Sequence, residues 1–65
     1  MTVRAEFRRE LERAVVAYDK VNAHLAKAAD YAVAGNRSEL DEPLLAIAKL
    51  NTVNKENLQA LHDAM

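Results

Sequence analysis

Apolar residues in the first half of the chain recur at alternating steps of four and three. The alternation is unbroken throughout the series. Such a seven-residue repeat is typical of helices that pack side by side. We therefore expect one helix over about residues 3–34. The positions of the series are Phe7, Leu11, Ala14, Tyr18, Val21, Leu25, Ala28 and Ala32.

The second half repeats this spacing and predicts a second helix over about residues 39–64. Its positions are Leu40, Leu44, Ile47, Asn51, Asn54, Leu58, Leu61 and Met65.

The segment Gly35-Asn36-Arg37-Ser38 separates the two series and predicts a loop over about 35–38. We expect Gly35 to take the left-handed conformation that often ends a helix. Pro43 leaves two alternatives for the start of the second helix. Either residues 38–41 form a separate turn and the helix begins near Glu42, or the second helix is bent at this point.

Folding the chain at Gly35 brings the two series together as the contact line of two antiparallel helices. In the expected register Leu25 lies opposite Ile47, Val21 opposite Asn51 and Tyr18 opposite Asn54. Alanines of the first helix then face leucines of the second, as close packing requires. The predicted fold is all-α: a single domain, residues 1–65, that forms an antiparallel two-helix hairpin of the coiled-coil type.

The composition provides few large apolar side chains for the core of a lone hairpin. Apolar residues form 51% of the 65 residues, but thirteen of them are alanines, and no cysteine is present to form a disulfide. So short a chain buries too little surface to be comfortably stable by itself unless a further interaction reinforces it. We therefore expect a homodimer, as a four-helix bundle, or docking on a helical protein partner.

A second apolar stripe beside the expected contact line supports this assembly. Leu50 and Val53 belong to it on the second helix, and Tyr31 widens the apolar surface of the first helix. We predict that the residues which contact the partner are Leu50, Val53, Asn57 and Tyr31.

Two asparagines interrupt the apolar series of the second helix. A buried amide without a hydrogen bond costs roughly 1–3 kcal/mol, so we expect Asn51 and Asn54 to form a polar layer with Asn22 and Tyr18. Such layers fix register and oligomeric order in helical bundles. In the alternative, the second helix turns Leu50 and Val53 inward and leaves Asn51, Asn54 and Asn57 on a face that meets a partner.

The charges argue against general binding to nucleic acids or anionic membranes. Nine Lys and Arg stand against ten Asp and Glu, a net charge of −1. A basic flank of the first helix, Arg9, Arg13, Lys20 and Lys27, offers an alternative function. In its architecture the chain resembles the repressor-of-primer hairpins, which implies an RNA-binding dimer that would use this flank.

A third hypothesis rests on the segment His24-Leu25-Ala26-Lys27-Ala28-Ala29. It resembles the His-x-x-Lys-Gly segment of histidine phosphotransfer domains, with Ala28 in place of the glycine. The resemblance implies that His24 accepts a phosphoryl group.

The sequence provides no constellation typical of an enzyme. It has no cysteine, no glycine-rich loop and no serine paired with a histidine, and neither histidine has a metal ligand at helical spacing. We expect neither a cofactor nor a metal. No apolar run approaches the roughly 18 residues of a membrane span, so we expect a cytoplasmic protein. The predicted function is a non-enzymatic interaction module: a small regulator, adaptor or chaperone-like subunit.

Overall fold

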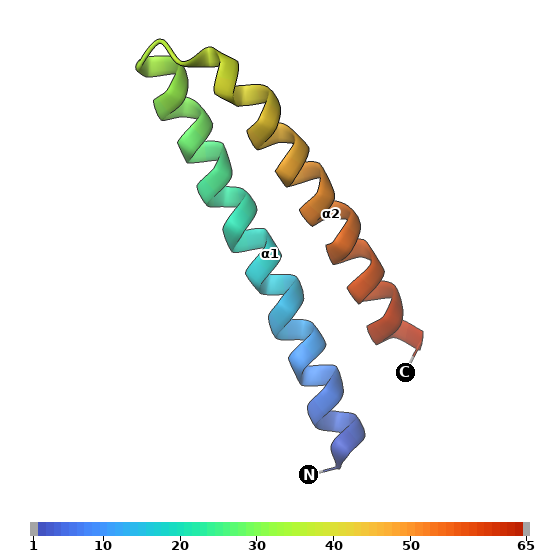
Figure 1. Ribbon diagram of the computed structural model, residues 1–65. Helices are drawn as coiled ribbons and strands as arrows, with labels where there is room; N and C mark the ends of the chain where they lie inside the picture. The colour runs from blue at the N-terminus through green and yellow to red at the C-terminus, as the bar shows by residue number, and fades with distance from the viewer. Residues whose placement is uncertain (1, 65) are drawn as a thin grey trace.

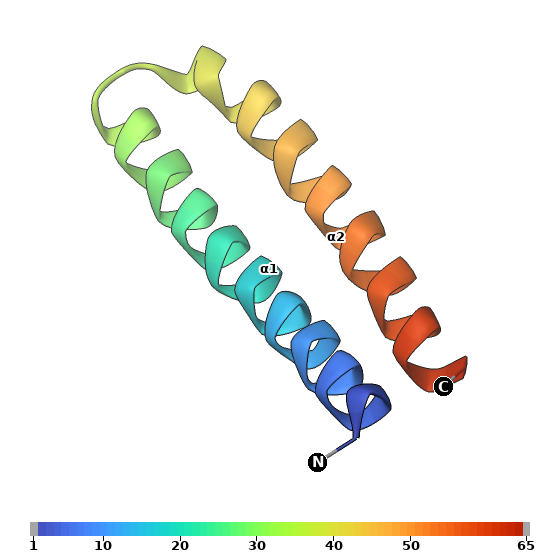
Figure 2. The same ribbon diagram turned by 60° about the horizontal axis from the view of Figure 1, so that its bottom comes forward.

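The computed structural model describes residues 2–64 as two long helices joined by a short turn. Helix α1 spans Val3–Ala34, the short 3-10 helix η1 spans Ser38–Leu40, and α2 spans Asp41–Ala64. The two long helices lie side by side and antiparallel, with the turn at one end and both termini at the other (Figure 1, Figure 2). The hairpin measures 51 × 17 × 11 Å. The prediction of an all-helical fold with two helices in contact is confirmed.

The beginning of α1 is capped by the residue that precedes it. The Oγ1 atom of Thr2 accepts a hydrogen bond from the backbone N–H of Ala5 at 3.1 Å. Glu6 adds a negative charge to the first turn, where it opposes the positive end of the helix dipole. The start of α1 is therefore encoded locally.

The end of α1 is closed by a Schellman motif, in which two loop N–H groups bond back to helix carbonyls. The N–H of Arg37 donates to the Ala32 carbonyl at 2.7 Å, and that of Asn36 to the Val33 carbonyl at 3.1 Å. The left-handed residue is Asn36, with φ of 61°, whereas Gly35 has φ of −90°. The expectation that Gly35 takes this conformation is wrong: Gly35 is the C-cap residue, and the left-handed position of the motif is the next residue, where asparagine tolerates a positive φ.

The start of α2 follows the first of the two alternatives for Pro43. Residues Ser38–Leu40 form the separate turn η1, and α2 begins at Asp41 with Pro43 as its third residue. Proline is tolerated there because the first four N–H groups of a helix have no partner within the helix.

The contact line between the helices, here called the seam, consists of the buried and half-buried positions. Leu11 is the one residue of 2–64 with less than a tenth of its surface exposed, at 8%. The seam positions of α1 are Leu11, Ala14, Val15, Tyr18, Asn22, Leu25, Ala29 and Ala32, and those of α2 are Asp41, Leu44, Ala48, Asn51, Asn54, Lys55, Leu58 and His62.

The register of the seam differs from the expected one by one residue. Asn51 lies against Asn22 rather than against Val21, and their side chains are hydrogen-bonded at 2.9 Å. An ion pair between Lys55 and Asp19, 2.7 Å long, fits the same register. With this shift, polar groups of the two helices pair across the seam. The expected register would hold the same groups apart. Met65, the last position of the expected series, lies outside the described residues.

Six of the fifteen expected contact positions that the structure describes consequently lie outside the seam. Leu11, Tyr18, Leu25, Leu44, Asn51 and Leu58 are seam residues as expected, whereas the remaining large apolar residues of the two series are exposed. These exposed residues are Phe7, Val21, Leu40, Ile47 and Leu61.

Candidate interaction surface

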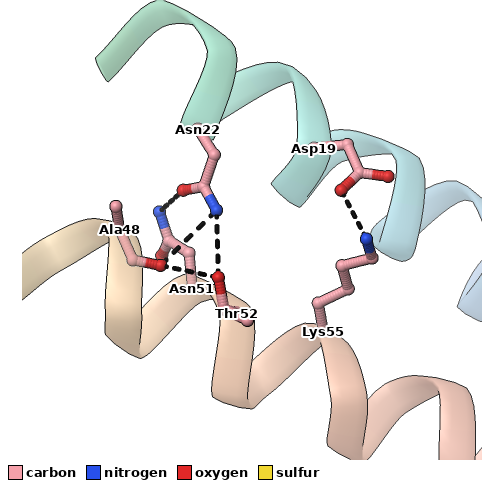
Figure 3. A network of polar contacts seen from close by, with 6 residues as sticks. All are labelled: Asp19, Asn22, Ala48, Asn51, Thr52 and Lys55. Carbon is pink, nitrogen blue, oxygen red and sulfur yellow. Dashed lines mark hydrogen bonds and ion pairs between the residues drawn. The ribbon is translucent and has the colours of Figure 1, made fainter. Parts of the chain in front are cut away.

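A polar network crosses the middle of the seam and fixes how the two helices face each other. Asn51 Nδ2 donates to Asn22 Oδ1, and Asn22 Nδ2 lies 3.4 Å from both the Ala48 carbonyl and Thr52 Oγ1. Thr52 also donates to the Ala48 carbonyl, at 3.0 Å. Figure 3 shows the two amides pointing toward each other. Any sliding of one helix along the other breaks these bonds, so the network specifies the register.

Two of the four residues predicted for the polar layer are therefore hydrogen-bonded to each other. Tyr18 and Asn54 are both half-buried, but no hydrogen bond joins them. The reason is the register, which brings Lys55 rather than Asn54 level with Tyr18.

One long side of the hairpin, the polar edge, is bridged by charged and polar side chains. Glu12, Asp19 and Thr52 each directly follow a seam position, and each contacts the opposite helix. Asp19 Oδ1 pairs with Lys55 at 2.7 Å, and Glu12 Oε1 lies 2.9 Å from His62 Nε2. These contacts fill the part of the polar edge between Glu12 and Thr52 with charged and polar groups, so this part is a poor candidate for binding an apolar partner.

His62 is held between two carboxylates, and this raises its pKa. The hydrogen bond to Glu12 is the largest cause, and the bond from Nδ1 to Asp63 at 3.2 Å is the second. The nearby Arg8 acts in the opposite direction. The protonated ring, which donates from both nitrogens, therefore links α2 to α1.

The raised pKa of His62 predicts a pH-dependent stability. Because the pKa is higher in the folded than in the unfolded chain, the contribution is complete below the ordinary histidine pKa of 6.5 and is lost as the pH rises through the folded value. Thermal unfolding followed by circular dichroism is expected to show a lower melting temperature at pH 8 than at pH 6.

Two variants make this prediction specific. His62→Gln and Glu12→Gln each remove one half of the bridge between the helices, and both are expected to reduce the difference between pH 6 and pH 8. The same difference in His62→Gln as in the wild type would contradict the assignment.

The opposite long side of the hairpin is apolar, and we call it the apolar face. On both helices, its members directly precede a seam position. Phe7 is the exception, and it lies seven residues before Ala14, which is a member. In an antiparallel pair such positions from the two helices lie on the same side. The large members are between 37% and 49% exposed. The face consists of Phe7, Ala14, Val21 and Ala28 on α1, and of Leu40 (at the end of η1), Ile47, Asn54 and Leu61; Ala14 and Asn54 are half-buried and belong to the seam as well.

The residues predicted to contact a partner lie partly beside this face. Leu50 and Asn57 are exposed and, by helical spacing, border it along α2. Val53, 51% exposed, lies on the outer side of α2, away from the seam. Tyr31, 79% exposed, lies on α1 near the turn. Tyr31 follows Ala28 at the same three-residue spacing, so three of these four residues border the apolar face and Val53 alone among them lies away from it.

A groove of about 590 Å³ lies at the turn end of the polar edge. Ala26, Ala29 and Leu45 contribute apolar lining, and Asp30, Asp41 and Glu42 are its acidic residues. The Oδ1 atom of Asp41 is buried and has no hydrogen bond within residues 2–64. This groove shares no residue with the apolar face.

The basic flank is only partly assembled. Arg9, Arg13 and Lys20 line a shallow hollow on α1, whereas Lys27 is not part of it. Glu12 lines the same hollow, and Arg13 is paired with Glu10 at 2.8 Å. The acidic neighbours reduce the positive field that RNA phosphates would require.

The described residues, 2–64, also bear on three other kinds of site: a phosphoryl acceptor, a metal site and a membrane span. His24 is exposed on α1, as the phosphotransfer hypothesis requires of an acceptor. Within residues 2–64, no group of three or more side chains is arranged to hold a metal ion. Neither α1 nor α2 has a stretch both long and apolar enough to cross a bilayer.

Comparison with known proteins does not assign a function. No protein family, curated protein or solved structure matches this chain. The functional proposal therefore rests on the geometry and chemistry of the hairpin.

Proposed function

We propose that this protein is a non-enzymatic interaction module, a small regulator or adaptor, that acts as a self-associated four-helix bundle. The apolar face is the surface through which two hairpins join. The observation that carries the proposal is the contrast between the two long sides of the hairpin. The polar edge is bridged by ion pairs and hydrogen bonds and exposes Val33 and Leu45 at its turn end, whereas the apolar face carries five large exposed apolar side chains along its whole length.

The accessible area supports association on the scale of a dimer. The chain exposes 4986 Å², whereas a monomeric protein of this mass typically exposes about 4,100 Å². The excess of about 900 Å² is close to the roughly 800 Å² that each partner buries in a standard protein interface. One second copy is therefore sufficient to hide it.

The contacts in the seam alone stabilise the folded hairpin only weakly. With Leu11 as its one buried residue among 2–64, the pair of helices removes few apolar side chains from water. Conformational entropy opposes folding by on the order of 1–2 kcal/mol for each backbone residue. Covering the apolar face would add Phe7, Val21, Ile47 and Leu61 to a shared core, and folding and association would then be coupled.

A charge placed in the apolar face tests this function. Ile47→Asp puts a carboxylate into the proposed interface, and the dimer dissociation constant is expected to rise at least about tenfold, equivalent to 1.4 kcal/mol. Sedimentation equilibrium measures this constant directly.

Val53→Asp is the matched control. Ile47 and Val53 are 49% and 51% exposed on the same helix, but only Ile47 belongs to the apolar face. Val53→Asp is expected to leave the dimer intact. Equal weakening by both variants, or by Val53→Asp alone, would contradict the choice of face and favour the surface predicted around Leu50 and Val53.

A further inference from the structure

The apolar face contains one polar side chain, and that side chain has no partner in the hairpin. Asn54 is half-buried, and within residues 2–64 its amide makes no hydrogen bond. A purely apolar partner would cover this amide and leave it unsatisfied, at a cost of roughly 1–3 kcal/mol. The occupant of the face therefore has to bring an amide or an equivalent group to this point.

We propose that Asn54 pairs with Asn54 of a second copy of the chain, across a two-fold axis that runs at right angles to the helices. This inference rests on the proposed self-association and specifies its geometry. An asparagine amide has both a donor and an acceptor, so two copies related by a two-fold axis satisfy each other. A second copy thus supplies the group that the face requires.

The spacing of the other face residues agrees with an axis at this level. On α2, Ile47 and Leu61 lie seven residues before and after Asn54, so the axis places Ile47 of one copy against Leu61 of the other. On α1, the four face residues are symmetric about the midpoint between Ala14 and Val21. Phe7 then meets Ala28, and Val21 meets Ala14, which pairs a large residue with a small one each time.

The two centres of symmetry lie at nearly the same height along the hairpin. In the register set by the hydrogen bond between Asn22 and Asn51, Asn54 is level with Asp19. The midpoint of the α1 set lies one to two residues away, about 2 Å along the helix. An axis through Asn54 thus brings Phe7 within about one helical turn of Ala28, and Val21 within about one turn of Ala14. A single axis therefore serves both helices, with α1 against α1, α2 against α2 and the two turns at opposite ends of the bundle.

The other two-fold arrangement of the same faces places the turns at the same end. It packs α1 of one copy against α2 of the other, and the face residue nearest to Asn54 is then Val21. The amide would remain unpaired beside a valine. The cost of that contact favours the arrangement with the turns at opposite ends.

Single cysteines test the geometry, because the chain has no native cysteine. Under mild oxidation, Asn54→Cys is expected to form a disulfide-linked species of twice the chain mass, and Val53→Cys, on the outer side of α2, is expected to remain a single chain. Non-reducing gel electrophoresis and mass spectrometry detect the products. A mixture of Ala14→Cys and Val21→Cys chains is expected to give the mixed disulfide, a readout that leaves Asn54 in place.

The opposite result is equally specific. A mixed disulfide between Val21→Cys and Asn54→Cys chains, without self-linkage of Asn54→Cys, would overturn the arrangement and favour turns at the same end. Failure of this geometry is distinguishable from failure of the proposed function. In the first case the wild-type chain is still a dimer by sedimentation, and in the second it is a monomer.

Discussion

Leu11→Ala is expected to lower the free energy of unfolding by about 2–4 kcal/mol, enough to unfold most of so small a module. Leu11 is 8% exposed and is the most completely buried side chain of residues 2–64. Truncation removes its methyl groups from the seam and leaves a cavity that two straight helices cannot readily close. Urea unfolding followed by circular dichroism at 222 nm measures the change.

Two comparisons isolate the contribution of burial. Leu25→Ala removes the same atoms from a half-buried seam position and is expected to cost less than Leu11→Ala. Leu45→Ala removes them from a side chain that is 55% exposed, and is expected to change stability by no more than about 0.5 kcal/mol. All three are compared at one protein concentration, because association adds to apparent stability. Equal losses for Leu11→Ala and Leu45→Ala would contradict the seam.

Asn51→Leu is expected to destabilise the protein by about 1–3 kcal/mol although it adds an apolar side chain to the seam. The substitution removes the donor that lies 2.9 Å from Asn22 Oδ1 and leaves that oxygen half-buried beside a leucine. Thermal or urea unfolding detects the loss.

The double variant Asn22→Leu, Asn51→Leu is the informative counterpart. With both amides gone, no polar group is left unpaired, and stability is expected to return to the wild-type level or to exceed it. The register loses its polar determinant, so we expect several associated species in sedimentation rather than one. Additive losses from the two substitutions would show that the amide pair does not act as a unit.

The alternating four-three spacing was sufficient to predict the two helices and their contact, but it left the register open. Each series merges two stripes, one in the seam and one on the apolar face, because both are apolar and both repeat every seven residues. Four of the seam positions outside the two series carry polar or charged residues, which an apolar pattern does not identify: Asn22, Asp41, Lys55 and His62. The hydrogen bonds and ion pairs of Asn22, Lys55 and His62 across the helices decide the register, and such pairings follow from three-dimensional contacts rather than from spacing.

The conformation of the turn and the residues of the apolar face also depend on three-dimensional contacts that the spacing of residues does not predict. The sequence favours Gly35 as the left-handed residue because glycine adopts a positive φ at the least cost. The hydrogen bonds that close α1 instead give Asn36 the left-handed conformation. The need for a partner was predictable from the thin core. The residues of the apolar face became separable from the seam only once Val21, Ile47 and Leu61 proved to be exposed while their neighbours were covered.

The most direct measurement of the central claim is the mass of the untagged wild-type chain in solution. Sedimentation equilibrium at micromolar concentration, with helical content recorded on the same sample, is expected to give twice the chain mass together with high helicity. A highly helical monomer at that concentration would show that Phe7, Val21, Ile47 and Leu61 need no neighbour, and it would contradict the account.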